Sequence, residues 1–251
     1  MKNERLKKVF AHTFSPKAVT LYIIVAIYAA TAGLLYSGAA SRQFSNMLIS
    51  VSSYVVLAIS LNLVVGFLGE LSLGHAGFMS VGLFSGCMFS IATQETLPLI
   101  VRMPVSMLIG GLAAAIVGLL VGLPALRLKG DYLAIVTLAC GEIINNIITN
   151  LDVTGGALGL NTSSIRSNSK TLLPYAIVLV LITAIVMMNV ENSRHGRAIM
   201  AIRDNRIAAE AMGINVTYYK LLVFVLAAFF AGMAGVLYGH SLANVKAASF
   251  D

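Results

Sequence analysis

One carboxylate stands inside a long apolar stretch of this sequence. Glu142 lies within residues 132–150, and Asn145 and Asn146 follow it by about one helical turn. A carboxylate near the middle of a bilayer costs at least about 2.5 kcal/mol, so it is expected to face other protein or a water-filled path. Two interpretations stay open for this polar stripe: a group that lines a transport path or pairs at a gate, and a structural group that hydrogen-bonds a neighbouring helix.

Three further polar residues lie at or near the end of another apolar stretch. Glu70 and His75 follow residues 46–67, where water at a membrane interface would solvate them, and Asn62 lies inside that stretch. With the polar stripe, these three complete our candidates for a translocation path. A Glu70/His75 acid–base pair in an intramembrane enzyme is a competing hypothesis, which requires a second polar group to converge on the first.

The usual signatures of catalysis and nucleotide binding are missing. The chain has no GxxxxGK[ST] phosphate loop, no HExxH and no GxSxG. Its four histidines lie far apart in the sequence, and Cys87 and Cys140 stand alone inside apolar runs without metal-ligand spacing. We therefore predict no catalytic residue, no metal site and no bound cofactor, and we do not expect this chain itself to bind a nucleotide phosphate.

The elements that must position the polar residues are membrane-spanning helices. Of 251 residues, 58% are hydrophobic and 11% are charged, whereas soluble domains carry about 25% charged residues. Several apolar runs reach the roughly 20 residues that cross a bilayer core. The prediction is an all-α, polytopic transmembrane bundle, surrounded by membrane lipid, of about seven spans: residues 18–36, 46–67, 75–92, 104–123, 132–150, 172–190 and 221–240.

The basic residues indicate the orientation of this bundle. The net charge of +7 comes from lysines and arginines at the ends of apolar runs rather than from one patch, so no nucleic-acid partner is expected. Most of the 17 basic residues fall on the side of the N-terminus, which the positive-inside rule makes cytoplasmic. Residues 152–170, rich in Gly, Ser and Asn, are then a loop on the far side. A signal peptide cleaved near Ala39 is an alternative to a retained first span.

Glycines four residues apart recur in the predicted spans. They form the pairs Gly82/Gly86, Gly118/Gly122 and Gly235/Gly239. Small residues let helix backbones approach closely, which favours helix association in lipid. Close helix packing is expected at these pairs, although glycine is also simply frequent in membrane helices.

One long polar segment, residues 194–220, interrupts the apolar runs with the sequence RHGRAIMAIRDNRIAAEAMGINVTYYK. Small and apolar residues from Ala198 to Met212 share one face at helical spacing, which predicts a surface helix. Gly213 is expected to end this helix and Thr217 to cap the next one. Two interpretations stay open: a basic loop that only sets topology, and a helix that docks into a groove of a partner protein.

Three stretches resemble the permease subunits of bacterial branched-chain amino acid ABC importers, and the LivM-type subunit most closely. They are LNLVVGFLGELSLGHAGFMSVG (residues 61–82), LRLKGDYLAIVTLACGEIINNI (126–147) and GRAIMAIRDNRIAAEAMGINVTYYKLLVFVLAAFFAGMAGVLY (196–238). The stretch TGGALGL (154–160) is similar to the external loop of that family.

The resemblance implies a role for the polar segment. Permeases of ABC importers carry a cytoplasmic "EAA" loop that docks in a groove of the ATPase, and residues 194–220 would be this coupling segment. The positions implied for coupling to the ATPase are Arg203, Asp204, Ala209, Glu210, Ala211 and Gly213, and Met212 departs from the family motif. The implied partners are two ABC ATPase subunits, a second permease of LivH type and a periplasmic amino-acid-binding protein, in the bacterial inner membrane.

The cargo that the resemblance implies is leucine, isoleucine or valine. Permeases of the same family also import urea or short-chain amides, which is the alternative cargo. Residues 1–251 are taken as one permease domain. Family members usually continue with further apolar helices, so a truncated product, or an inert assembly fragment, is another alternative.

Overall fold

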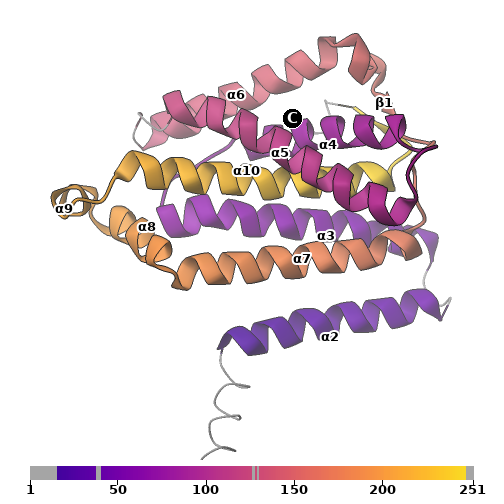
Figure 1. Cartoon of the computed structure of the whole chain (residues 1–251), viewed down its shortest axis with the longest axis horizontal. Helices are drawn as coiled ribbons and strands as arrows, with labels where there is room; N and C mark the ends of the chain where they lie inside the picture. Colours follow the sequence, from indigo (N-terminus) through magenta and orange to yellow (C-terminus); the bar gives the residue numbers. More distant parts are fainter. Residues whose placement is uncertain (1–15, 38–40, 126–127, 129, 247–251) are drawn as a thin grey trace, which may run out of the picture.

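The computed structural model describes residues 16–37, 41–125, 128 and 130–246, which are almost entirely helical (Figure 1). Its elements, in chain order, are α2 (Pro16–Tyr36), α3 (Arg42–Asn62), the π-helix η1 (Leu63–Leu68), α4 (His75–Ala92), α5 (Leu99–Ala125), α6 (Asp131–Asn150), the 3-10 turns η2 (Asp152–Thr154) and η3 (Gly156–Leu158), β1 (Leu160–Asn161), α7 (Ser169–Asn192), α8 (Arg194–Asp204), α9 (Arg206–Ala211), α10 (Val216–Ser241) and β2 (Asn244–Val245).

The predicted polytopic helical bundle is confirmed. In the described part of the chain, six helices are long and apolar enough to cross a membrane: α3 continued by η1, α4, α5, α6, α7 and α10. Within α2, residues Tyr22–Leu35 form a shorter apolar helix. A seventh crossing by α2 and a cytoplasmic N-terminus stay predictions.

One helix start differs from its prediction. α5 begins at Leu99, so Pro104 lies inside the helix rather than at its first position. The reason is Pro98, whose carbonyl oxygen accepts the backbone N–H groups of Val101 and Arg102 at 3.1 and 3.0 Å. These bonds start the helix one turn before the proline that the sequence favoured.

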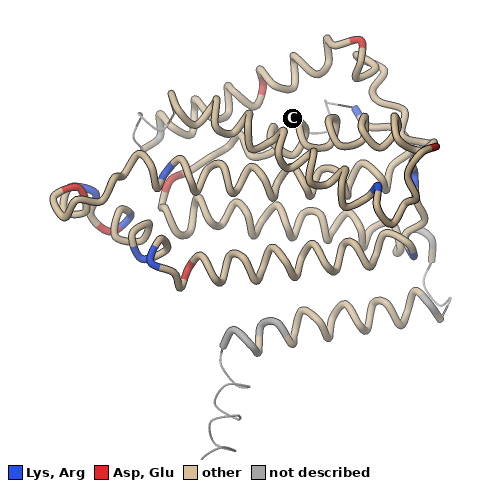
Figure 2. The backbone as a smooth tube through the Cα atoms, viewed as in Figure 1, with Lys and Arg blue, Asp and Glu red and all other residues tan. Residues whose placement is uncertain are grey.

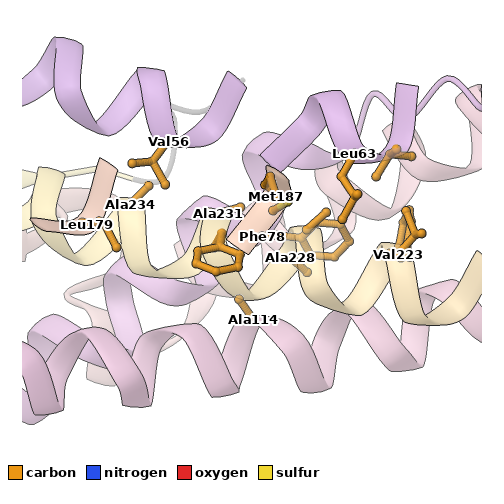
Figure 3. Packing of buried hydrophobic residues seen from close by; sticks show 14 of the residues in the cluster. Val56, Leu63, Phe78, Ala114, Leu179, Met187, Val223, Ala228, Ala231 and Ala234 are labelled. Atoms are coloured by element: carbon orange, nitrogen blue, oxygen red, sulfur yellow. The ribbon is translucent and has the colours of Figure 1, made fainter. Parts of the chain in front are cut away.

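The centre of the bundle is α10 (Figure 1). It packs against α4 and α5 on one side and α3 on the other, while α7 lies against α3, and α2 and α6 are outermost. Buried aliphatic side chains from α3, α5, α7 and α10 pack in one cluster with Phe78 of α4, whose ring lies edge-on to Phe224 with centroids 5.4 Å apart (Figure 3). Accordingly, 67% of the apolar 18-residue stretch of α10 is buried, but only 33% of the corresponding stretch of α6.

Glycines bring α4, α5 and α10 together without intervening side chains. A Cβ atom on Gly82 would overlap the backbone of Gly232, and one on Gly232 would lie 2.6 Å from the Gly110 carbonyl oxygen. A Cβ on Gly235 would overlap the Met79 carbonyl oxygen. The prediction of close packing is confirmed where Gly82 and Gly235 meet neighbouring backbone, as expected when close approach must hold helices together in lipid.

The two ends of the bundle differ in composition. α8 and α9 cover one end, where Figure 2 shows a concentration of acidic and basic residues. At the other end β1 pairs antiparallel with β2, with Leu160 opposite Val245. The predicted loop 152–170 therefore holds two 3-10 turns and a short strand. We call these the α8–α9 end and the β1–β2 end.

Candidate functional site

The polar segment forms two short helices that project from the bundle (Figure 1). The turn from α7 into α8 is tight, because a Cβ on Gly196 would overlap the carbonyl oxygens of Val190 and Glu191. The Ser193 hydroxyl caps α8 by accepting the Gly196 N–H at 3.1 Å. Ile199 and Ile202 are buried on the side of α8 that faces the bundle. α8 is therefore anchored, and α9 extends beyond it.

The single surface helix expected from the sequence is wrong, because Asn205 breaks it. Asn205 has an extended backbone (φ −155°, ψ 100°), and its side chain accepts the Ala208 N–H at 3.0 Å. An asparagine that hydrogen-bonds the backbone in this way starts a new helix. The small residues from Ala198 to Met212 therefore do not share one continuous face. The cap predicted at Thr217 is also displaced, since the Asn215 side chain caps α10.

The predicted stop at Gly213 is confirmed. Gly213 has φ +81°, and its N–H donates to the Glu210 carbonyl while the Ile214 N–H donates to that of Ala209, both at 3.0 Å. This is the pair of bonds that closes a helix in a Schellman motif, with glycine in the left-handed position. The motif gives the tip of the segment a defined shape.

Large apolar side chains are exposed at this tip. Ile207 is 80% and Met212 is 83% exposed, whereas Ala209 is buried. Arg206 pairs with Glu210 at 2.9 Å, and both remain partly exposed. Among the predicted coupling residues, Asp204, Glu210, Ala211 and Gly213 are exposed and Ala209 anchors α9. The tip is an apolar surface edged by charge, which suits protein contact.

Arg203 does not simply point outward. Its guanidinium donates to the Gly66 carbonyl oxygen at 2.9 Å and to Asp204 Oδ1 at 3.1 and 3.2 Å. A Cβ on Gly69 would lie 2.6 Å from Arg203 Cγ, so the arginine stem rests on this glycine. Arg203 therefore connects the end of α8 to the end of η1.

A second connection lies close by. Lys220, near the start of α10, forms an ion pair with Glu70, and their side chains are only 4% and 15% exposed. Glu70 follows η1 in the chain, so both connections reach the same segment. A cavity of about 340 Å³ lies beside these two connections and is lined by Leu68, Gly69, Glu70, Leu71, Gly130, Ile202, Arg203, Arg206 and Lys220.

The other predicted path residues near this end have different partners. His75 Nε2 lies 2.9 Å from Ser60 Oγ, which joins α4 to α3. Glu70 is paired with Lys220 instead, so the two do not form the acid–base pair that an intramembrane enzyme would need. Asn62, at the end of α3, is exposed.

The polar stripe of α6 is divided between two faces. Asn145 is buried, whereas Glu142 and Asn146 are exposed on the outer side, with Asn146 Nδ2 donating to the Glu142 carbonyl at 2.9 Å. Glu142 therefore does not face the interior of this chain. On an outermost helix, its carboxylate requires other protein or water beside it.

Sequence analysis missed three residues of this site. The individual roles of Lys220 and Ile207 depend on distant neighbours, and Gly66 contributes a backbone carbonyl that has no sequence signal. The presence of Ile207 within a polar segment was the one hint that the sequence offered. Helical spacing assigned Met212 to a face but could not show that it lies at the tip.

Known proteins that are similar to this chain include permeases of branched-chain amino acid transport systems. A protein-family model described as "branched-chain amino acid transport system / permease component" matches residues 43–251. The "high-affinity branched-chain amino acid transport system permease protein LivM" of Salmonella typhimurium is 32% identical over 78% of this chain and 52% of its own length. The Escherichia coli protein of the same name is 31% identical over the same shares.

A more distant relative covers a larger share of both chains. The "probable branched-chain amino acid transport permease protein LivM" of Methanocaldococcus jannaschii is 28% identical over 82% of this chain and 70% of its own length. The chain spans about half the length of the two enterobacterial relatives. No solved structure matches it significantly.

Proposed function

Because this chain belongs to the family of permease components of branched-chain amino acid transport systems, we propose that it is the membrane-spanning permease subunit of an ATP-driven importer. Its cargo is leucine, isoleucine or valine, as the names of its relatives indicate for those proteins. It resides in the cytoplasmic membrane, and it works as a transport component rather than as an enzyme.

The observation that carries this proposal is the exposed tip of α9. The chain has no phosphate-binding loop of its own, so energy must come from partner ATPases. A short helix with two exposed apolar residues, Ile207 and Met212, is suited to insertion into a groove of such a partner. The Schellman closure at Gly213 keeps the tip in one shape, which lowers the entropic cost of docking.

The remaining partners follow from the same mechanism. Two ATPase subunits bind at the α8–α9 end, which is cytoplasmic, and a periplasmic amino-acid-binding protein delivers cargo at the β1–β2 end. ATP favours one of two conformations of the complex by binding it more tightly, which switches the access of the path. A second permease of LivH type completes the path beside this chain.

The outer face of α6 is our candidate for this chain's share of the path. Glu142 and Asn146 are exposed there, and a carboxylate facing lipid would be costly. Asn145, the third polar residue of this stretch of α6, is buried on the inner face of the helix. Lower leucine uptake by Glu142→Gln, with ATPase binding retained, supports this assignment, and unchanged uptake contradicts it.

The docking proposal is tested by placing a charge on the tip. Ile207→Asp should weaken the ATPase contact by about 2 kcal/mol or more, roughly thirtyfold, as expected for a buried apolar anchor. The measurements are co-purification of the ATPases with the complete importer and uptake of radiolabelled leucine, with valine and urea as competitors. Retained ATPase binding and uptake would refute the proposal.

A matched control lies at the other end of the bundle. Ile100 in α5 is 76% exposed, close to the value for Ile207. Ile100→Asp makes the same chemical change away from the docking tip. It should leave co-purification of the ATPases unchanged.

A further inference from the structure

The segment between α3 and α4 has an uncommon backbone. α3 continues into the π-helix η1, and Gly69, with φ +75°, ends it by donating its N–H to the Val64 carbonyl. π-helices are rare and occur mostly as short insertions at functional positions. The wide turn departs from the usual α-helical hydrogen-bond pattern, so contacts with neighbouring elements help to hold it in this form.

Arg203 supplies one of these contacts. It donates to the Gly66 carbonyl oxygen at 2.9 Å, inside the last turn of η1. A cation at the C-terminal end of a helix is favoured by the helix dipole. The arginine belongs to the last turn of α8, directly before the break at Asn205. A displacement of α9 that is carried into α8 therefore acts on this bond.

The Glu70–Lys220 pair supplies the other contact. The pair is largely buried, and Glu70 Oε2 has no further hydrogen-bond partner among the described residues. Lys220 is thus the group that holds Glu70 in place. Through it, the start of α10 is attached to the same segment.

The other side of the segment is fixed to α6. The Leu73 N–H donates to Thr137 Oγ1 at 3.1 Å, and a Cβ on Gly74 would overlap the Thr137 carbonyl oxygen. Toward α8 the segment instead borders the cavity of about 340 Å³. Arg203 rests on Gly69 beside this cavity and bonds the Gly66 carbonyl, so α8 is joined directly to the segment and can pull on it.

We propose that Arg203 and the Lys220–Glu70 ion pair transmit movement of the α8–α9 coupling segment to residues 63–74, and through them to α3 and α4. This inference rests on the proposed function, because it takes the ATPase to move α9. Arg203 is a positioning residue in this scheme: it does not contact the ATPase, and it holds the π-helix in register with α8. Coupling then passes through a defined structural element, the segment of residues 63–74, which contacts α8, α10 and α6.

The test is Arg203→Ala in the complete importer, with Arg197→Ala as the matched control. Arg197 is also an exposed arginine of α8, but among the described residues its guanidinium donates to the Asn192 carbonyl alone, at 3.3 Å. We expect Arg203→Ala to keep the ATPases bound and hydrolysing ATP, while leucine imported per ATP falls about fivefold or more. Arg197→Ala should keep the wild-type ratio. A wild-type ratio for Arg203→Ala would overturn the inference.

A distance measurement separates this inference from the docking proposal. Spin labels at the exposed positions Leu71 and Arg194 report on the segment of residues 63–74 and on α8, respectively. In the otherwise wild-type importer the segment and α8 should move as one body, so the separation of the two labels should be the same without nucleotide and with trapped ATP. In Arg203→Ala the separation should change. A separation that changes in the otherwise wild-type importer contradicts the inference even if Ile207→Asp confirms docking.

Loss of ATPase binding in Arg203→Ala would also overturn the inference, because it would make Arg203 a docking residue. Failure of the docking proposal itself gives a different pattern, since Ile207→Asp would then keep its ATPases. The two proposals can therefore fail separately.

Discussion

The two ends of the bundle are held together by different kinds of contact. At the α8–α9 end, Arg203 and Lys220 reach across a cavity to a carbonyl and a carboxylate. At the β1–β2 end, short side chains and backbone groups make the contacts. The Thr162 N–H donates to the Ala243 carbonyl oxygen at 3.0 Å, and the Thr162 hydroxyl donates to the Leu242 carbonyl oxygen at 2.9 Å.

The difference follows from side-chain length. A long charged side chain can join two elements beside a space into which they can move together, whereas a threonine hydroxyl or a backbone amide keeps its bond only if the backbone stays in place. The β1–β2 end is also joined to α10 through the Ser167 N–H, which donates to the His240 carbonyl at 3.2 Å. The α8–α9 end is therefore suited to movement, and the β1–β2 end is suited to keep its contacts during that movement.

The largest effect should come from breaking the buried ion pair. Lys220→Met leaves Glu70 buried without its cation, which costs about 3–5 kcal/mol. The measurement is the thermal unfolding midpoint of the purified complex in detergent. The double variant Glu70→Gln/Lys220→Met removes both charges and should recover most of the loss. A single variant as stable as wild type would show that the α8–α9 end does not depend on this pair.

A smaller effect is expected at the β1–β2 end. His240 Nδ1 lies 2.9 Å from the Val236 carbonyl, so it carries the proton, and Nε2 accepts from Ser90 Oγ at 2.9 Å. Ser90→Ala leaves that buried nitrogen without a donor and should cost about 1–2 kcal/mol in the same unfolding assay. Leucine imported per ATP should not change, because this end does not carry the motion. A changed ratio would break the contrast between the two ends.

Ser80 provides the control within α4. Its hydroxyl is buried and has no hydrogen-bond partner among the described residues. Ser80→Ala removes a polar group that is already unsatisfied, so stability should stay constant or rise. Equal losses for Ser80→Ala and Ser90→Ala would mean that the Ser90–His240 bond contributes nothing specific.

The smallest effect on stability is expected at the tip of α9. The Arg206–Glu210 pair is about 40–50% exposed by side chain, and such pairs four residues apart on a helix contribute about 0.3–0.5 kcal/mol. Glu210→Gln should therefore barely shift the unfolding midpoint, while it weakens ATPase association. A large loss of stability would show that the tip is part of the folded core rather than a surface for a partner.

The positions of the helices could be predicted from the sequence because lipid requires continuous apolar runs with internal backbone bonds. The helix stop at Gly213, just after α9, could also be predicted from a local property, since glycine takes the left-handed backbone conformation most easily. The break at Asn205 was missed although its signal is also local. Asn205 fits the helical spacing of the predicted surface helix. Its capping role is visible only in the structure, where its side chain accepts the Ala208 N–H.

The contacts of the candidate site could not be predicted in this way. Lys220 and Glu70 are far apart in the sequence, as are Arg203 and Gly66, and no periodicity relates such pairs. The direction of Glu142 was also undetermined, because a polar residue in a span signals only that lipid is unfavourable, and not which neighbour replaces it.

By itself, the sequence determined that this protein is a polytopic helical bundle with one polar segment, since hydrophobicity and backbone hydrogen bonding are local properties. Only the tertiary structure decided that α10 is central and α6 peripheral, that the polar segment exposes Ile207 at its tip, and that Arg203 holds a π-helix. Those outcomes depend on which helices glycines allow to approach, and this is a property of the packed bundle rather than of any one segment.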